Sequence, residues 1–128
     1  MNDKREPVKL SLPAKQEYAL VARMALSGMG VLAGLDVDLI GDLRTVAGEC
    51  FDCLCHQSAR PNRIDVCAWT EEGRLHCCFE ASDREECACC EPPLDLTVTK
   101  GVLETLMPEV NITNDDGGVK RIQCSMRI

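Results

Sequence analysis

The sequence predicts an α/β (α+β) two-layer sandwich, in which helices lie on one face of a mixed, mostly antiparallel sheet of about five strands. Two patterns carry this prediction. Short runs alternate apolar and polar residues, as half-buried strands do, and longer segments repeat apolar residues at steps of three and four, as amphipathic helices do. In chain order the elements are strand, helix, helix, strand, strand, long loop, helix, strand and strand. The 128 residues are predicted to form a single domain.

The first part of the chain is predicted to hold one strand and two helices. Residues 7–12 alternate apolar and polar positions up to Pro13, which is typical of a short strand. Residues 15–33 carry a broad apolar stripe at helical spacing and are followed by Gly34, a frequent residue after a helix C-terminus. Residues 37–57 repeat the helical pattern and form the second helix, around which the rest of the chain is expected to pack.

The second part is predicted to hold two hairpins and one helix. Residues 64–69 and 75–79 alternate around a short turn and make the first hairpin. Residues 80–94 are charged, rich in cysteine and interrupted by two prolines, which predicts a long loop. Residues 97–107 have a short helical pattern that stops at a proline, and residues 110–128 make the closing hairpin.

Composition excludes several classes of partner. The net charge of −7 and the pI near 4.8 argue against nucleic acid, because phosphate binding needs a surplus of Lys and Arg. The most apolar run, residues 24–35, holds about 12 residues where a membrane span needs about 20, so no membrane partner is expected. The first residues, MNDKREPVKL, precede no apolar segment, which predicts a cytoplasmic protein without a secretory signal.

Ten cysteines are many for a cytoplasmic chain of this size, since thiols in that compartment are kept reduced. Four lie in strand-like runs and are predicted to be small buried hydrophobes: Cys67, Cys77, Cys78 and Cys124. A second group supplies an alternative metal-binding or redox-sensing site: Cys53, Cys55, Cys87, Cys89 and Cys90. The spacing CxCC is not usual for zinc, and the helical CxxC lacks the strand-turn setting of a redox motif, so no metal is expected.

One flank of the second predicted helix carries polar side chains beside its apolar stripe. Four residues fall together there because steps of three, four and seven return to nearly the same side of a helix: Asp42, Glu49, Cys53 and His56. Glu49 is the candidate functional acid on this flank. The alternative is that the flank is only the solvated edge of a buried helix.

Three segments carry a resemblance to a known family: LSLPAKQEYALVARMALSGM, DLRTVAGECFDCLCHQ and TKGVLETLMPEVNI. Together they resemble the bacterial serine-kinase anti-sigma factors, which have the histidine-kinase-like (GHKL, Bergerat) ATPase fold, and the resemblance covers nearly the whole chain. In that family the second helix carries a Glu, the catalytic carboxylate, followed four residues later by an Asn that binds Mg²⁺. Glu49 matches the Glu, and Cys53 stands at the Asn position.

The resemblance also implies positions for the nucleotide. The family's adenine-binding Asp-x-Gly box falls on Ala81, Ser82 and Asp83, so that Asp83 is the nearest acid, and Glu80 is reached by a shift of register. The phosphate-binding glycine turn falls near Lys100 and Gly101. The implied cofactor-binding set is therefore Glu49, Cys53, Asp83, Lys100 and Gly101. Because a thiol is a poor ligand for Mg²⁺ and the glycines are mostly missing, no cofactor is expected, and ATP with Mg²⁺ is expected only if the site works.

The resemblance implies an anti-sigma-factor-like regulatory protein of a partner-switching pathway, which binds a protein partner such as a sigma factor or its antagonist. One alternative is an active ATP-dependent serine/threonine kinase with Glu49 as its catalytic carboxylate. A second alternative is the cysteine-based metal or redox domain. A homodimer is left open.

Overall fold

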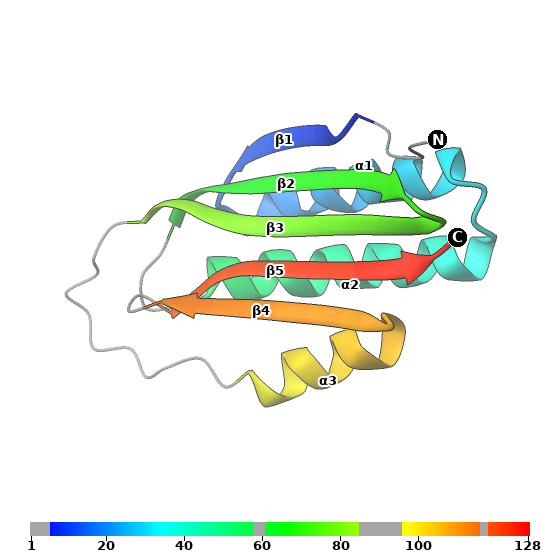
Figure 1. Ribbon diagram of the computed structural model, residues 1–128. Helices are drawn as coiled ribbons and strands as arrows, with labels where there is room; N and C mark the ends of the chain where they lie inside the picture. Colours follow the sequence, from blue (N-terminus) through cyan, green and yellow to red (C-terminus); the bar gives the residue numbers. More distant parts are fainter. Residues whose placement is uncertain (1–5, 58–60, 85–95, 116–117) are drawn as a thin grey trace.

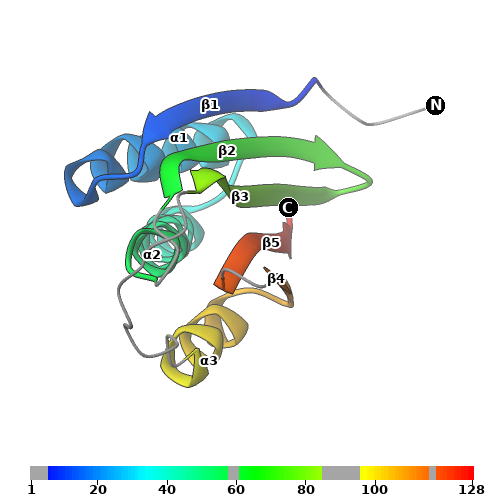
Figure 2. The same cartoon turned by 90° about the vertical axis from the view of Figure 1, so that its left-hand side faces the viewer.

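The computed structural model describes residues 6–57, 61–84, 96–115 and 118–128, apart from the side chains of residues 83 and 84. Within this part of the chain the fold is α+β, as the sequence predicts: one open sheet of five strands with three α-helices. Figures 1 and 2 show that all three helices lie on the same face of the sheet. The molecule thus has two layers, and the other face of the sheet is covered by none of the described elements.

The sheet has the spatial order β1-β2-β3-β5-β4, and each pair of neighbours is antiparallel. The strands are β1 (Val8–Pro13), β2 (Pro61–Glu71), β3 (Arg74–Arg84), β4 (Glu109–Asp115) and β5 (Gly118–Arg127). β2 and β3 are joined by two residues, Glu72 and Gly73, with φ of 51° and 72°. Both values lie in the left-handed region, which matches the right-handed twist of a tight hairpin.

The predicted loop at residues 80–94 is wrong in its first part, because β3 continues to Arg84. The alternation that marks a strand persists there: Phe79 and Ala81 both face the core, with Glu80 between them on the other side. A small alanine among charged residues is a weak apolar signal, which is why the sequence pattern ends too early.

The helices are α1 (Ala19–Leu32), α2 (Val37–Cys55) and α3 (Thr97–Leu106), with a short 3₁₀ turn (η1, Gln16–Tyr18) before α1. α2 lies in the middle and packs against α1 on one side and α3 on the other, which confirms that the first two helices lie side by side (Figure 1). The Asp36 side chain accepts a hydrogen bond of 2.9 Å from the Leu39 amide and so caps α2. Gly34, with φ of 78°, ends the first helix as predicted.

The core lies between α2 and the sheet. α2 contributes Leu43, Val46, Cys50, Phe51 and Leu54, all fully buried, and the sheet contributes Ile64, Leu75, Phe79 and Ile122. Burial of one such large side chain stabilises the folded state by about 1.5–3 kcal/mol. The predicted apolar stripe of the second helix is therefore the contact that holds the two layers together.

A buried glutamine fastens the end of α2 to the sheet. The Gln57 amide group donates to the Val119 carbonyl at 2.8 Å and accepts from the Val119 amide at 2.8 Å, as a neighbouring strand would. The same group donates to the Leu54 carbonyl at 3.3 Å. Gly118 makes this approach feasible, because a Cβ there would lie 2.7 Å from the glutamine oxygen, and its φ of 112° favours glycine.

The first prediction concerns this contact. Gln57→Ala should lower the free energy of unfolding by about 2–4 kcal/mol, since it leaves the buried backbone groups of Val119 without this partner. Urea denaturation measures the change. Gln123→Ala is the matched control: it removes an amide that accepts one exposed hydrogen bond from Arg121, and should cost less than about 1 kcal/mol. Equal losses in the two variants would contradict the role of Gln57.

Candidate functional site

Glu49 lies half-buried near the middle of α2. The preceding residue, Gly48, leaves room for the Arg23 side chain of α1, whose Nε lies 3.2 Å from the position a Cβ would take. That Nε is buried and has no hydrogen-bond partner among the described residues. Asp52, one turn further along, accepts a hydrogen bond from the Gln16 side chain. These two contacts belong to the side of α2 that faces α1 and the turn before it.

Cys53, at the position of the magnesium ligand in the resembling family, is buried, with 4% of its surface exposed. Burial, together with the nearby carboxylates of Glu49 and Asp52, raises the pKa of the thiol to about 11. Burial likewise raises the pKa of Cys55 to about 11. Both groups stay protonated at neutral pH, and a protonated soft thiol is no ligand for Mg²⁺.

The positions expected to hold adenine lie on both faces of β3. Ala81 is buried on the helix side, opposite Ile64 of β2. Glu80 lies on the other face, so it cannot join a site with Glu49. The side chain of Asp83 is outside what the structure describes. Ala81 therefore places a methyl group where the family has the Asp carboxylate that accepts a hydrogen bond from adenine.

Lys100 and Gly101 both lie inside α3 rather than in a turn before it. Lys100 forms an exposed ion pair with Glu104 at 3.8 Å. Anions bind to the free amides of the first helical turn, whereas amides from the second turn onward are bonded within the helix. The structure therefore does not bring Lys100 and Gly101 into a phosphate-binding turn.

An open depression of about 520 Å³ lies where α3 meets β4, lined by Glu104, Met107, Pro108, Glu109, Val110 and Asn111. None of the residues predicted to bind nucleotide lines it. Two carboxylates at its wall make it unfavourable for a phosphate group.

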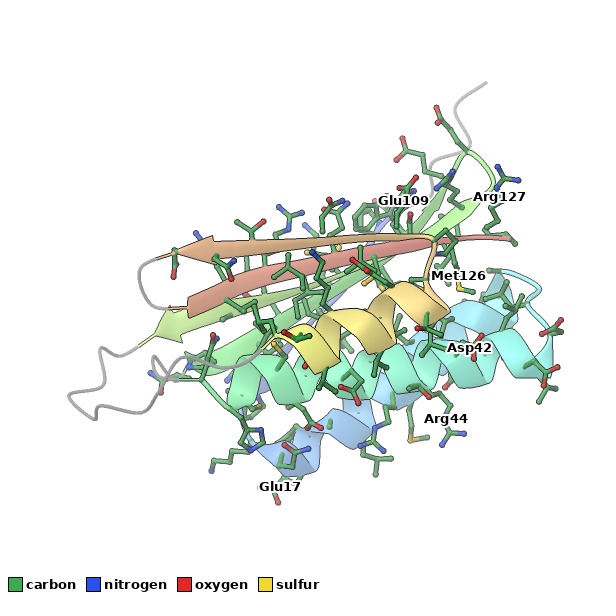
Figure 3. The ribbon with its side chains drawn as sticks, turned by 90° about the horizontal axis from the view of Figure 1, so that it is seen from below. Glu17, Asp42, Arg44, Glu109, Met126 and Arg127 are labelled. Atoms are coloured by element: carbon green, nitrogen blue, oxygen red, sulfur yellow. The ribbon has the colours of Figure 1, made fainter. Side chains whose placement is uncertain are left out.

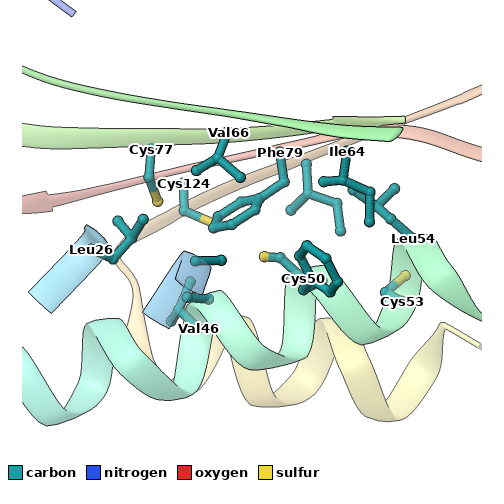
Figure 4. Close-up of a cluster of buried hydrophobic side chains, with 14 of the residues drawn as sticks. Leu26, Val46, Cys50, Cys53, Leu54, Ile64, Val66, Cys77, Phe79 and Cys124 are labelled. Atoms are coloured by element: carbon teal, nitrogen blue, oxygen red, sulfur yellow. The ribbon is translucent and has the colours of Figure 1, made fainter. Parts of the chain in front are cut away.

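Three cysteines meet in the core, an arrangement that the sequence pattern does not predict. Cys50 of α2, Cys77 of β3 and Cys124 of β5 converge there (Figure 4). Burial raises the pKa of Cys50, whereas hydrogen bonding from Cys50 and Cys77 lowers the pKa of Cys124. In the sequence each of these cysteines stands at an apolar position of its helix or strand pattern. Such a position predicts that the thiol is buried, but it does not predict which thiols lie together.

The burial predicted for the strand cysteines is confirmed at Cys77, Cys78 and Cys124, but Cys67 is only half-buried. Within the described ranges no group of three or more His, Cys, Asp or Glu is placed to hold a metal ion. Of the alternative cysteine set, Cys53 and Cys55 are buried on α2, and Cys87, Cys89 and Cys90 lie outside the described residues.

Comparison of the sequence with models of known protein families and with curated proteins gives no match. Among the described helices, none is both long enough and apolar enough to cross a membrane.

The raised pKa of Cys53 predicts how stability depends on pH. The folded protein holds this proton up to about pH 11, whereas the unfolded chain releases it near the ordinary value of 9.0. The stabilisation is therefore complete below pH 9 and is lost as pH rises toward 11. Urea denaturation across this interval should show a smaller decrease in Cys53→Ala than in the natural protein.

Thr45→Ala is the control for this measurement, since it changes the same helix without removing a titrating group. Thr45→Ala should show the same decrease in the free energy of unfolding with rising pH as the natural protein. A Cys53→Ala curve that falls as steeply as that of the natural protein would contradict the assignment.

Proposed function

We propose that this chain is a cytoplasmic regulatory protein, similar to the anti-sigma factors of partner-switching pathways, that acts by binding a protein partner and not by transferring phosphate. The observation that carries the proposal is the apolar outer face of α1. The fold class is the predicted one, α+β with the helices on one face of a five-stranded sheet, and is compatible with the proposal.

The outer face of α1 exposes large apolar side chains. The exposed fractions are 56% for Leu20, 66% for Met24, 65% for Val31 and 73% for Leu32. Within α1 the sole charged residue is Arg23, which turns toward Gly48 of α2. The four side chains, together with the exposed Val21, form a stripe along the helix, which we call the α1 stripe. A contiguous apolar stripe on an otherwise charged protein is typical of a surface that binds another protein.

Acidic residues border the α1 stripe at both ends. Glu17 precedes the helix, and Asp36 and Asp38 follow it at the start of α2, where Val37 is also exposed. Figure 3 shows Glu17 on the helix side of the molecule, away from Glu109 and Arg127 on the far side of the sheet. A complementary partner would present an apolar patch with basic residues around it, because opposite charges at the rim favour the correct docking.

The nucleotide positions give less support to the kinase alternative. Glu49 is present and half-buried, but the magnesium position is a buried thiol, the adenine position is a buried methyl group, and the phosphate position is the body of a helix. Catalysis of phosphate transfer depends on holding the phosphates and Mg²⁺ in place. A carboxylate alone is insufficient for that role.

The partner prediction is tested by placing a charge in the α1 stripe. Met24→Glu should weaken binding of the cognate sigma factor or antagonist by at least about tenfold, since it puts a carboxylate into an apolar contact. Purified sigma factors and antagonists of the source organism are titrated by calorimetry against each variant. Val98→Glu is the matched control, because Val98 of α3 has a similar exposed fraction, 73% against 66% for Met24, and lies outside the stripe.

Circular dichroism should show that both variants remain folded, since both substitutions are at exposed positions. Equal affinity of Met24→Glu and the natural protein for every binding partner found would contradict the role of the α1 stripe.

The same protein should bind Mg-ATP with a dissociation constant no better than about millimolar. Calorimetry measures this, and incubation with the partner and labelled ATP measures phosphate transfer. The kinase alternative would be favoured if Mg-ATP bound with a micromolar dissociation constant, phosphate were transferred, and Glu49→Gln abolished the transfer. Cys53→Asn, which restores the expected magnesium ligand, is measured in the same assays for comparison.

A further inference from the structure

Two cysteines face each other on the uncovered face of the sheet. Cys67 of β2 is directly opposite Cys78 of β3 in the register of the hairpin. Successive side chains of a strand point to opposite faces. Because Val66 and Ala68 on β2, and Cys77 and Phe79 on β3, point into the core, Cys67 and Cys78 both point away from the helices.

The spacing of this pair suits a disulfide. Directly opposed residues of an antiparallel pair have Cα atoms about 4.5–5.5 Å apart. A disulfide joins Cα atoms about 4.4–6.8 Å apart. Both cysteines are free thiols in the structure.

One side chain beside Cys78 favours its ionisation against the effect of burial. The Arg121 Nε of β5 donates a hydrogen bond of 3.0 Å to the Cys78 sulfur. Burial raises the pKa of Cys78, and Glu80 and Cys67 raise it further, whereas Arg121 lowers it. The guanidinium group therefore stabilises a thiolate at a position where burial opposes one. Cys67 is half-exposed and provides access for a small oxidant.

The protein contains a natural comparison for this pair. Cys77 of β3 and Cys124 of β5 are also directly opposite each other, but on the core face. Their exposed fractions are 0% and 1%. In both pairs the two cysteines are directly opposite each other on neighbouring antiparallel strands. The pairs differ in how far their thiols are exposed to solvent.

We propose that Cys67 and Cys78 form a redox-active dithiol that a peroxide converts to a disulfide. The half-exposed Cys67 thiol gives up its proton and its sulfur attacks hydrogen peroxide. The O–O bond breaks, a sulfenic acid forms, and the released hydroxide takes up the proton and leaves as water. The Cys78 thiol then gives up its proton and its sulfur attacks the sulfenic sulfur. The S–OH bond breaks, the S–S bond forms, and the hydroxide leaves with that proton as a second water. In total two thiols lose two protons and two electrons, and one peroxide becomes two waters. The bond joins β2 to β3 and removes the Cys78 thiol that Arg121 contacts.

The test uses the full chain carrying Cys87→Ser, Cys89→Ser and Cys90→Ser, so that these cysteines do not react. After treatment with hydrogen peroxide, the mass should fall by about 2 Da with two thiols lost, and the protein should remain a monomer on a non-reducing gel. Cys67→Ser and Cys78→Ser should each abolish this product. Cys77→Ala and Cys124→Ala should each retain it, which separates the two pairs.

Two further readouts are available without relying on any cysteine variant. Trp69, the only tryptophan, stacks on His76 with ring centres 5.1 Å apart. Trp69 is two residues from Cys67, and His76 is two residues from Cys78, so the stacked rings lie on the same face as the pair. Disulfide formation should therefore quench the tryptophan fluorescence, and dithiothreitol should restore it. Arg121→Gln should slow the reaction severalfold, whereas Arg127→Gln, further along β5, should not.

Three results would overturn the proposal. One is a product that persists in Cys67→Ser, the second is a disulfide between two chains instead of within one, and the third is oxidation of Cys67 to sulfinic acid while Cys78 stays free.

Discussion

The contact between the apolar face of α2 and the sheet is the interaction on which the rest of the structure depends. Leu43, Val46, Cys50 and Leu54 bury against residues from β2, β3 and β5. With α2 fixed in the middle, α1 and α3 pack on its two sides. Because all the described helices cover one face, the outer side of α1 and the far face of the sheet are left without a partner in the described chain.

The central place of α2 also explains why the two cysteines near its C-terminal end are buried. Helices on both sides widen the buried arc of α2, so Cys53 and Cys55 are enclosed together with the apolar stripe. Enclosed thiols keep their protons, since a charge there would lose its hydration. The polar flank of α2 keeps two half-buried carboxylates, Asp42 and Glu49. Cys53, on the same flank, contributes to the packing of α2.

The two faces of the sheet give the same residue type different chemistry. Cysteines alternate between them along β3, where Cys77 faces the core and Cys78 faces away. In the core a thiol behaves as a small hydrophobe with a weak hydrogen bond. On the uncovered face a guanidinium group donates a hydrogen bond to the Cys78 sulfur, and the opposite thiol, Cys67, is half-exposed. A shift of one residue in the strand register would exchange these roles.

The sequence by itself determined the elements and their order, because helix and strand periods are local properties of the chain. The helix predicted for residues 37–57 is observed at Val37–Cys55, and the hairpin around Gly73 is in place. Only the tertiary structure decided which side chains meet across long separations. Gln57 contacts Val119, 62 residues away, and Cys50 meets Cys77 and Cys124. Periodicity fixes which face of an element is apolar, but not which element covers it, so the burial of Cys53 and the exposure of the α1 stripe followed from packing alone.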